Sequence, residues 1–194
     1  MTFIELLKRM GVPAGVMLTL TRDNLHHVAP LIRALGNRVD VFAFSRLAPF
    51  GSGASLALPS RGEYRSLLCD YFALARENPR LRLKDSLLNL VHGTLEGPPI
   101  AGCTQFGCGA AFSTVALLAD GEVHACRRFP SLIGNVYEST LSTIYESDAA
   151  ARYRRRPDGC KGCSLIAACG GCPAVTAGLG LDPFRDRDPF CWRD

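Results

Sequence analysis

Most of the cysteines in this 194-residue chain occur in its second half, where their thiols could bind metal. Eight of the nine are clustered there: Cys103, Cys108, Cys126, Cys160, Cys163, Cys169, Cys172 and Cys191. Two pairs, Cys160 with Cys163 and Cys169 with Cys172, have only two residues between their members. That spacing lets both sulfurs reach one metal centre, so each pair is a chelating unit for zinc or for an iron–sulfur cluster. Eight thiols exceed what one tetrahedral ion needs and are enough for two sets of four.

The cysteine count also indicates the redox compartment. Nine is an odd number, and the first residues lack the long apolar stretch and small-residue cleavage site of a secretory signal. A secreted disulfide scaffold is therefore disfavoured, because thiols this dense in a reducing compartment are more often ligands than bridges. We expect a cytoplasmic protein.

Composition excludes several other classes. The chain is 47% hydrophobic and 21% charged, with a mean hydropathy of +0.10, so it can bury a core and is not disordered. No apolar run approaches the ~18 residues of a membrane-spanning helix. The net charge of +4 is modest and spread along the chain, which gives no basic face for nucleic acid. We expect neither a membrane nor a nucleic-acid partner.

The elements around the cysteines include a predicted hairpin. After Pro98 and Pro99 the sequence changes to cysteines, glycines and short apolar runs, which places a domain boundary near residue 97 and divides the chain into residues 1–97 and 98–194. Asp120 and Gly121 are a two-residue turn signal between apolar runs at 114–118 and 122–124. Such a hairpin would bring Cys126 back toward Cys108.

The first half is predicted to alternate helices and strands. Apolar spacing predicts helices over residues 3–10, 25–35 and 61–77, and continuous apolar runs predict strands over 15–20 and 39–45. This order implies parallel strands joined by right-handed crossovers, which is an α/β layer or a segment of a barrel.

The predicted strand at residues 15–20 needs another strand or chain to cover its edge. Its uninterrupted apolar run is typical of a strand buried on both faces. As an outer strand it would present a long, uncharged, hydrophobic edge, which proteins normally cover. We therefore expect an incomplete domain, a homodimer or a separate chain that supplies the missing strands.

The cysteine pattern of residues 103–191 resembles the SPASM domain of radical S-adenosylmethionine (SAM) enzymes. The resemblance is carried by the hairpin between Cys108 and Cys126, the run from Cys160 to Cys172, and the late Cys191. It implies an α/β fold: the C-terminal part of a (β/α)6 partial TIM barrel, followed by a small cysteine-rich α+β SPASM domain with a β-hairpin. The segment 46–53 is similar to the loop after the last strand of that barrel.

The same resemblance implies two auxiliary [4Fe-4S] clusters. The first set of ligands would be Cys103, Cys108, Cys126 and Cys172, and the second set would be Cys160, Cys163, Cys169 and Cys191. One departure is the spacing between Cys169 and Cys172, where the family commonly has three intervening residues; Gly170 and Gly171 permit the tighter turn.

Residues 102–112 are most similar to maturases of ribosomally synthesised peptides, and among these they resemble the thio(seleno)oxazole-modifying kind. The resemblance therefore implies a peptide substrate and an electron donor as partners. A radical SAM enzyme also needs a C-x3-C-x2-C triplet to bind SAM at an open iron, and this sequence contains none. We expect the chain to be the C-terminal portion of such an enzyme, unable to cleave SAM alone, with SAM bound only if an N-terminal half or an oligomeric partner completes the barrel.

Two alternatives stay open on sequence grounds. The chain could be a stand-alone iron–sulfur protein that transfers electrons or binds a partner, or an interaction module stabilised by zinc. Outside the two sets, we interpret Cys69 as a small packed hydrophobe, and the arginines at 152–156 as a solvated helix end.

Overall fold

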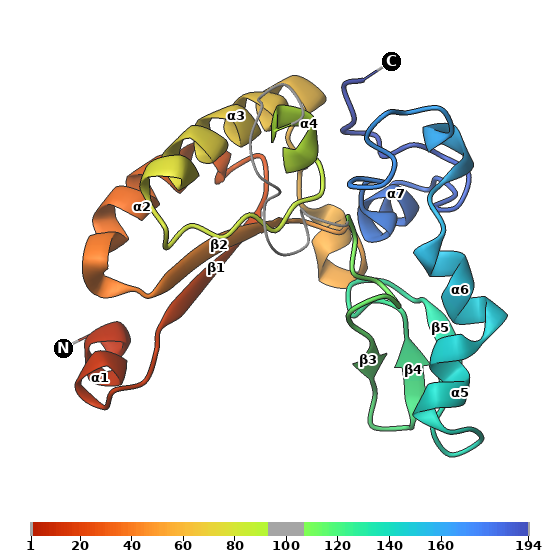
Figure 1. Ribbon diagram of the computed structural model, residues 1–194. Coiled ribbons are helices and arrows are strands. Elements are labelled where there is room, and N and C mark those ends of the chain that lie inside the picture. Colours follow the sequence, from red (N-terminus) through yellow and green to blue (C-terminus); the bar gives the residue numbers. More distant parts are fainter. Residues whose placement is uncertain (1, 93–106, 194) are drawn as a thin grey trace.

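The computed structural model describes residues 2–92 and 107–193, and it consists of two halves that lie side by side (Figure 1). The domain boundary predicted near residue 97 and the ligand candidate Cys103 both lie outside the described residues. Among the helices in these ranges, none combines the length and apolar character needed to cross a membrane.

The first half is a small parallel α/β layer. Its elements are α1 (Phe3–Arg9), β1 (Gly15–Leu20), α2 (Val28–Leu35), β2 (Val41–Arg46), α3 (Arg61–Glu77) and α4 (Leu88–His92), with 3-10 turns at Leu25–His27, Gly36–Arg38 and Gly51–Ser55. Strands β1 and β2 pair in parallel from Gly15 opposite Val41 to Leu20 opposite Arg46. The predicted parallel order is confirmed.

The long helix α3 begins at a capping box. Ser60 Oγ accepts a hydrogen bond from the Glu63 N–H over 3.2 Å, and a Glu63 carboxylate oxygen accepts from the Ser60 N–H over 2.7 Å. These bonds satisfy two backbone N–H groups that have no acceptor within the first turn of the helix. The helix then buries one side, which includes Tyr64, Leu68 and Tyr71.

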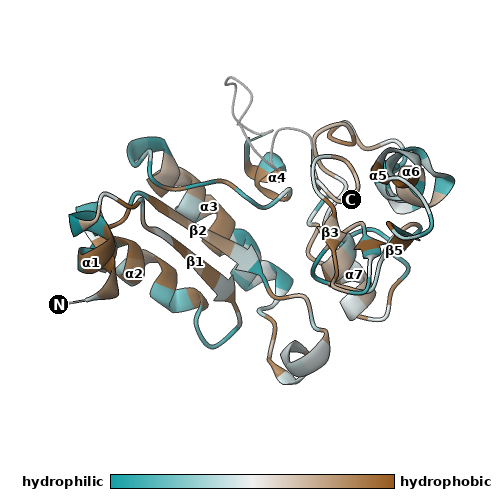
Figure 2. Ribbon diagram, turned by 90° about the horizontal axis from the view of Figure 1, so that it is seen from below, coloured by the Kyte–Doolittle hydropathy of each residue, from teal (hydrophilic) through white to brown (hydrophobic). Residues whose placement is uncertain are grey.

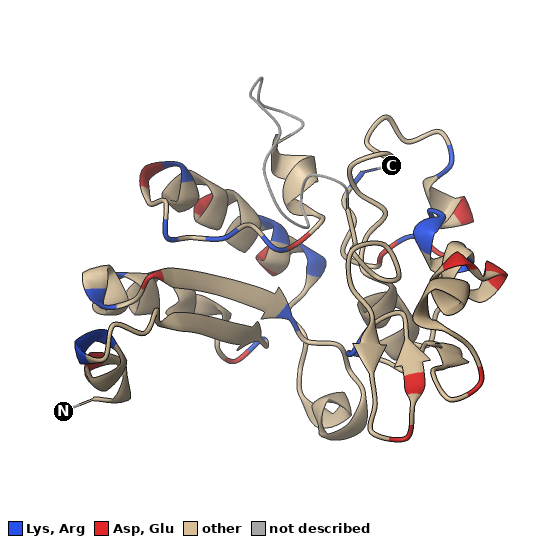
Figure 3. Ribbon diagram, turned by 60° about the horizontal axis from the view of Figure 1, so that its bottom comes forward, with Lys and Arg blue, Asp and Glu red and all other residues tan. Residues whose placement is uncertain are grey.

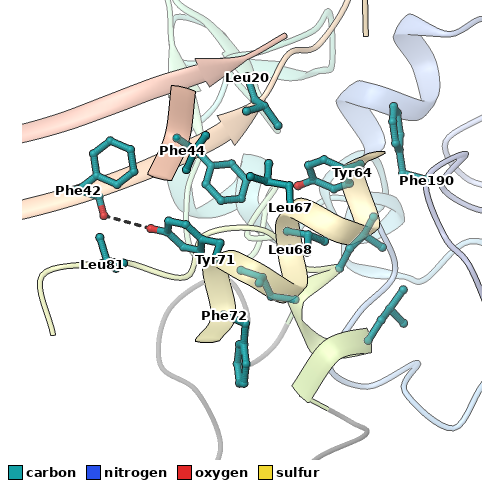
Figure 4. Packing of buried hydrophobic residues seen from close by; sticks show 14 of the residues in the cluster. Leu20, Phe42, Phe44, Tyr64, Leu67, Leu68, Tyr71, Phe72, Leu81 and Phe190 are labelled. Atoms are coloured by element: carbon teal, nitrogen blue, oxygen red, sulfur yellow. Dashed lines mark hydrogen bonds between the residues drawn. The ribbon is translucent and has the colours of Figure 1, made fainter. Parts of the chain in front are cut away.

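That buried side packs on one face of the two-stranded sheet (Figure 4). The ring of Phe44 from β2 makes edge-to-face contacts with Tyr64 and Tyr71, with centroids 6.5 and 4.7 Å apart. Helix α2 adds Val28 and Ile32 to the same core. Figure 2 shows both strands as mainly hydrophobic, and this apolar surface is what anchors the two helices.

The expectation that β1 is buried on both faces is wrong. Burial alternates along the strand: Leu20 is 1% exposed, whereas Met17 is 44% exposed. The reason is that α2 and α3 cover the face that carries Leu20, whereas Met17 and Thr19 on the other face of β1 stay exposed. Figure 3 shows no charged residue along β1.

The edges of this sheet differ. The outer edge of β2 is bonded to the segment at residues 80–82, because Phe42 N–H donates to Arg80 O over 2.9 Å and Arg82 N–H donates to Phe42 O over 2.8 Å. Within the described ranges, β1 pairs only with β2. The outer edge of β1 is therefore the one that we predicted to need a cover.

The second half is built on a three-stranded antiparallel sheet. Its elements are β3 (Ala116–Leu117), β4 (Glu122–His124), β5 (Leu132–Asn135), α5 (Leu141–Glu146), α6 (Asp148–Arg154) and α7 (Pro173–Gly178), with a 3-10 turn at Asp158–Cys160. The predicted hairpin is confirmed as β3–β4, and Gly121 adopts a φ of 84° in its turn. Strand β5 was not predicted.

The two halves share one hydrophobic core. Phe190 lies edge-to-face against Tyr64 of α3, with ring centroids 5.4 Å apart, and Val175 of α7 belongs to the same cluster. Phe50, beyond β2, lies 6.1 Å from Phe129 between ring centroids. This packing places the cysteine-rich loops against the carboxyl end of β2.

Candidate metal centre

Four of the predicted ligands line one cavity. Cys160, Cys163, Cys169 and Cys191 surround it together with apolar residues of the α4 region, including Leu87 and Leu90. Cys160 and Cys169 are buried, and the other two are partly buried. The structure thus brings together all four members of the second predicted set.

Local backbone bonds hold the first three of these cysteines. Cys160 ends the 3-10 turn, and its carbonyl accepts from the Cys163 N–H over 3.1 Å, so the two-residue spacing folds into a turn. The Cys169 N–H donates to Leu165 O over 2.9 Å in a second turn. Gly159 N–H donates to Arg185 O over 2.7 Å and ties the first turn to the C-terminal loop that carries the fourth thiol.

Burial favours the protonated thiols of Cys160 and Cys169 when no metal is bound. Burial raises the pKa of Cys169 to about 11, although the backbone amides of Gly171 and Gly170 bond to its sulfur and oppose the rise. Burial also raises the pKa of Cys160; Arg187 opposes this rise, and the neighbouring thiols of Cys191 and Cys163 add to it. Metal binding here would release protons, because only thiolates are good ligands.

The other predicted set lies beside a second, smaller core cluster of the cysteine-rich half, formed by Ala110, Ala111, Val123, Ala125, Ile133, Ile144 and Ala150. Cys126 follows β4 and is held by Ser131, whose Oγ accepts from the Cys126 N–H over 3.0 Å. Burial raises the pKa of Cys126; the Arg128 backbone amide opposes the rise, and the nearby thiol of Cys172 increases it. Cys126 and Cys172 are therefore electrostatic neighbours.

Cys108 approaches the same place from the chain that precedes the hairpin. It packs against the second core cluster, as Cys126 does, and it lines a small pocket with Gly170 and with Pro173, the residue after Cys172. The structure thus relates Cys126 to Cys172, and Cys108 to the core cluster beside Cys126, and Cys103 lies outside the described residues.

The tight turn between Cys169 and Cys172 separates the two sets. Gly170 and Gly171 have φ angles of 104° and 67°, which favour glycine over residues with a side chain. A Cβ on Gly171 would lie 2.4 Å from the Cβ of Asp188, and one on Gly107 would lie 2.2 Å from the Cys169 carbonyl oxygen. Sequence reasoning anticipated the turn but not these close approaches.

The thiols do not meet at a single point. Over residues 2–92 and 107–193, no three His, Cys, Asp or Glu side chains are close enough to hold one metal ion. All eight cysteines in these ranges are free of disulfide bonds.

Sequence reasoning missed the ionic groups around the site. Arg46, at the end of β2, is buried between Asp85 and Asp188. Arg128 donates from Nη2 to Cys172 Sγ over 3.0 Å. The one available signal was a charged residue that ends the otherwise uncharged β2, and nothing in the sequence pairs Arg46 with Asp188.

Two further interpretations are corrected. Cys69 is exposed on α3 and is not a packed hydrophobe, because the buried side of the helix carries Leu68 and Phe72 instead. The solvated end predicted for the arginines near Pro157 holds for Arg152 and Arg155, which are exposed, but not for Arg154, which donates to Ala111 O and Tyr145 O, over 3.0 and 2.7 Å. The loop carbonyls of the cysteine-rich half need such donors.

Comparison with known proteins agrees with this geometry. Residues 108–173 match the SPASM family of iron–sulfur cluster-binding domains. The AdoMet-dependent heme synthase of Methanosarcina barkeri is 24% identical over 208 residues, which covers 97% of this chain and 58% of that protein. The antilisterial bacteriocin subtilosin biosynthesis protein AlbA of Bacillus subtilis is 23% identical over 209 residues, covering 97% of this chain and 42% of AlbA. The chain spans about half the length of these curated relatives.

Two solved structures share the fold. The crystal structure of Streptococcus suis SuiB bound to S-adenosylmethionine has a TM-score of 0.68 at 16% identity, covering 98% of this chain and 47% of SuiB. Native anSMEcpe with bound AdoMet and the Cp18Cys peptide has a TM-score of 0.60 at 15% identity, covering 96% of this chain and 55% of that protein. The predicted resemblance to radical SAM/SPASM proteins is confirmed, and so is the α/β fold of a partial barrel followed by a SPASM domain.

Proposed function

We propose that this chain is the C-terminal part of a radical SAM/SPASM enzyme that modifies a ribosomally synthesised peptide. In this proposal, residues 1–97 contribute late strands and helices of the barrel, and residues 98–194 form a domain that holds two auxiliary [4Fe-4S] clusters. The observation that carries the proposal is the gathering of Cys160, Cys163, Cys169 and Cys191 around one cavity in a chain that matches an iron–sulfur domain.

The donor chemistry fits iron–sulfur clusters. Four thiols suit a [4Fe-4S] cluster, in which each thiolate binds a different iron, and the same set also suits a structural zinc ion. The match of residues 108–173 to an iron–sulfur cluster-binding domain is what favours an iron–sulfur core over a lone zinc ion.

We assign the second cluster to the four cysteines of the cavity and the first to Cys103, Cys108, Cys126 and Cys172. Clusters bound there would accept or relay single electrons, or would organise the substrate site. The chain itself would exclude water from the second set with Leu87 and Leu90, and would supply backbone N–H donors to Cys169. Both features tune a cluster potential.

A peptide substrate is supported by the relatives. AlbA is named for the biosynthesis of a bacteriocin, and anSMEcpe was solved with a bound peptide. The open face of β1, on the side of the sheet opposite α2 and α3, is the side that faces the interior of a (β/α) barrel. We infer that this face belongs to the reaction chamber once the remaining strands are present.

The chain is proposed not to cleave SAM alone, because its sequence holds no C-x3-C-x2-C triplet. The remaining barrel strands, in an N-terminal half or an oligomeric partner, would cover the outer edge of β1, and an electron donor would reduce the clusters in a reducing compartment such as the cytoplasm.

Sequencing the DNA upstream of the Met1 codon tests this proposal. We expect a reading frame that encodes C-x3-C-x2-C, and the combined polypeptide should produce 5′-deoxyadenosine from SAM where this chain alone does not. An unrelated gene or a long intergenic gap would contradict the proposal and would favour the stand-alone iron–sulfur protein.

A further inference from the structure

A buried ionic triad joins the end of β2 to the loops that carry the cysteines. The Arg46 side chain is 3% exposed, and those of Asp85 and Asp188 are 7% and 1% exposed. Arg46 Nε donates to Asp85 Oδ2 over 2.6 Å, and Nη1 donates to Asp188 Oδ1 over 2.9 Å. Nη2 lies 2.8 Å from Asp188 Oδ2, at ion-pair distance but without hydrogen-bond alignment. The rings of Tyr64 and Phe190 enclose the guanidinium.

The second carboxylate of this triad holds both sets of cysteines. Asp188 Oδ2 accepts from the Cys172 N–H over 2.8 Å, and Oδ1 accepts from the Phe190 N–H over 2.9 Å. The Asp188 carbonyl accepts from the Cys191 N–H, also over 2.9 Å. One residue therefore fixes the backbone of Cys172, from the first set, and of Cys191, from the second.

The other carboxylate supports the same loop from the opposite side. Asp85 Oδ1 accepts from the Leu87 N–H over 2.8 Å and fixes the turn that precedes α4. From that turn, Ser86 Oγ donates to Gly171 O over 2.9 Å, and Asn89 Nδ2 donates to Ala168 O over 2.7 Å. The loop from 168 to 172, which carries a thiol of each set, is thus held between two turns that both depend on Arg46.

The energetics of this arrangement favour a positioning role over a stabilising one. Taking three charges out of water carries a desolvation cost that apolar residues of similar size avoid, so a buried ion group is a weak source of net stability. The guanidinium of Arg46 instead orients the two carboxylates, because its planar group fixes the plane and the distance of the carboxylates that it binds. Burial lowers the pKa of Arg46, but the attraction of Asp188 and Asp85 outweighs this and raises it well above its usual value, so the group stays charged.

We propose that Arg46 and Asp188 are positioning residues that set the separation and the reduction potentials of the two clusters. This inference rests on the proposed function. It adds that the last described strand of the barrel half, and not the cysteine-rich half alone, determines the cluster geometry. The triad also places a net charge of −1 next to both sets, which lowers the tendency of a nearby cluster to accept an electron.

The test compares anaerobically prepared full-length variants by iron content, by redox titration and by electron paramagnetic resonance of the reduced clusters. Arg46→Lys keeps the charge but cannot hold two carboxylates in a fork, and Asp188→Asn keeps the shape but loses the charge. We expect both variants to shift the midpoint potentials of both clusters and to change the magnetic coupling between them. Asp188→Asn should shift the potentials upward, because a negative charge is lost.

The matched control is Tyr71→Phe. It removes a buried hydroxyl in the same core, which donates to Arg82 O over 3.0 Å. This control should lower the melting temperature and leave both potentials and the coupling at their wild-type values. A purely structural role for the triad predicts that Arg46→Lys behaves in the same way.

The failures of the two proposals can be told apart. If the wild-type chain binds two clusters, and Arg46→Lys folds with unchanged potentials and coupling, the positioning role is overturned and the proposed function stands. Should Asp188→Asn fail to fold, Arg46→Lys decides alone. A wild-type chain that binds no iron overturns the proposed function and the positioning role together.

Discussion

Arg128 donates a hydrogen bond from Nη2 to the sulfur of Cys172 over 3.0 Å. The two residues are 44 positions apart in the chain, and the bond links the loop after β4 to the start of α7. A cationic donor stabilises a thiolate and the negative charge that a cluster gains on reduction. Arg128 is therefore placed to raise the reduction potential of the cluster that Cys172 would bind.

Replacing this arginine should affect one cluster only. In Arg128→Gln we expect a lower midpoint potential for the cluster of the first set, because a positive charge and a hydrogen bond to sulfur are lost. The cluster of the second set should keep its potential. Redox titration followed by electron paramagnetic resonance measures the potentials of the two clusters separately. The neighbouring Arg127 is exposed, so Arg127→Gln is the control. Equal shifts in both variants would rule out a specific effect of the bond to Cys172.

The two ligand sets should lose iron independently. Cys160→Ser and Cys126→Ser should each lower the iron content from about eight atoms to about four per chain, because each set binds one [4Fe-4S] cluster. The double variant should retain almost none. Cys69→Ser is the control, since Cys69 is exposed on α3 and lies outside both sets. Colorimetric iron and sulfide determination provides the measurement, and a complete loss of iron in either single variant would contradict two independent sets.

The turn between Cys169 and Cys172 should tolerate no side chain. Gly171→Ala would place a Cβ 2.4 Å from the Cβ of Asp188, so we expect the turn to open and the iron content to fall by at least half. Gly162→Ala is the matched control, because Gly162 also has a positive φ, of 82°, but a Cβ added there would meet no atom within 4 Å. This control should lower the free energy of unfolding by only ~1 kcal/mol, which is the cost of holding an alanine in the left-handed backbone conformation. Similar iron losses in the two variants would attribute the effect to backbone strain alone.

The open face and edge of β1 should make the isolated chain associate with itself. Met17 is 44% exposed and Thr19 is also exposed on this face, so Met17→Lys with Thr19→Lys adds charge without disturbing the core under α2 and α3. We expect the wild-type chain to sediment as a concentration-dependent mixture of species and the double variant to shift toward a monomer, because charged residues discourage pairing at a free edge. A wild-type chain that stays monomeric at all concentrations would show that the edge needs no cover.

Local patterns predicted what depends on neighbours in the sequence. The helix from Arg61 to Glu77 and the strand from Gly15 to Leu20 have the bounds that apolar spacing and the continuous apolar run predict. The hairpin followed from one Asp-Gly turn signal. The convergence of Cys160, Cys163, Cys169 and Cys191 was expected from the family resemblance, since spacing alone cannot bring Cys191 to the other three.

The features that the sequence did not predict depend on contacts between residues far apart in the chain. Strand β5 is short, and its residue Gly134 packs against Ile144 of α5, so no alternating pattern marks it. Arg46 and Asp188 are 142 positions apart, and a single charged residue at the end of a strand is predicted to be solvent-exposed unless its partners are known. The burial of β1 on one face only was also out of reach, because it depends on which face the helices cover.

Metal analysis of the anaerobically purified chain tests the central claim most directly. Mössbauer spectroscopy of the protein enriched in iron-57, together with iron, sulfide and zinc determination, should give the signature of [4Fe-4S] clusters, with about eight iron and eight sulfide per chain. About two zinc atoms per chain with no sulfide, or a folded chain without any bound metal, would contradict it.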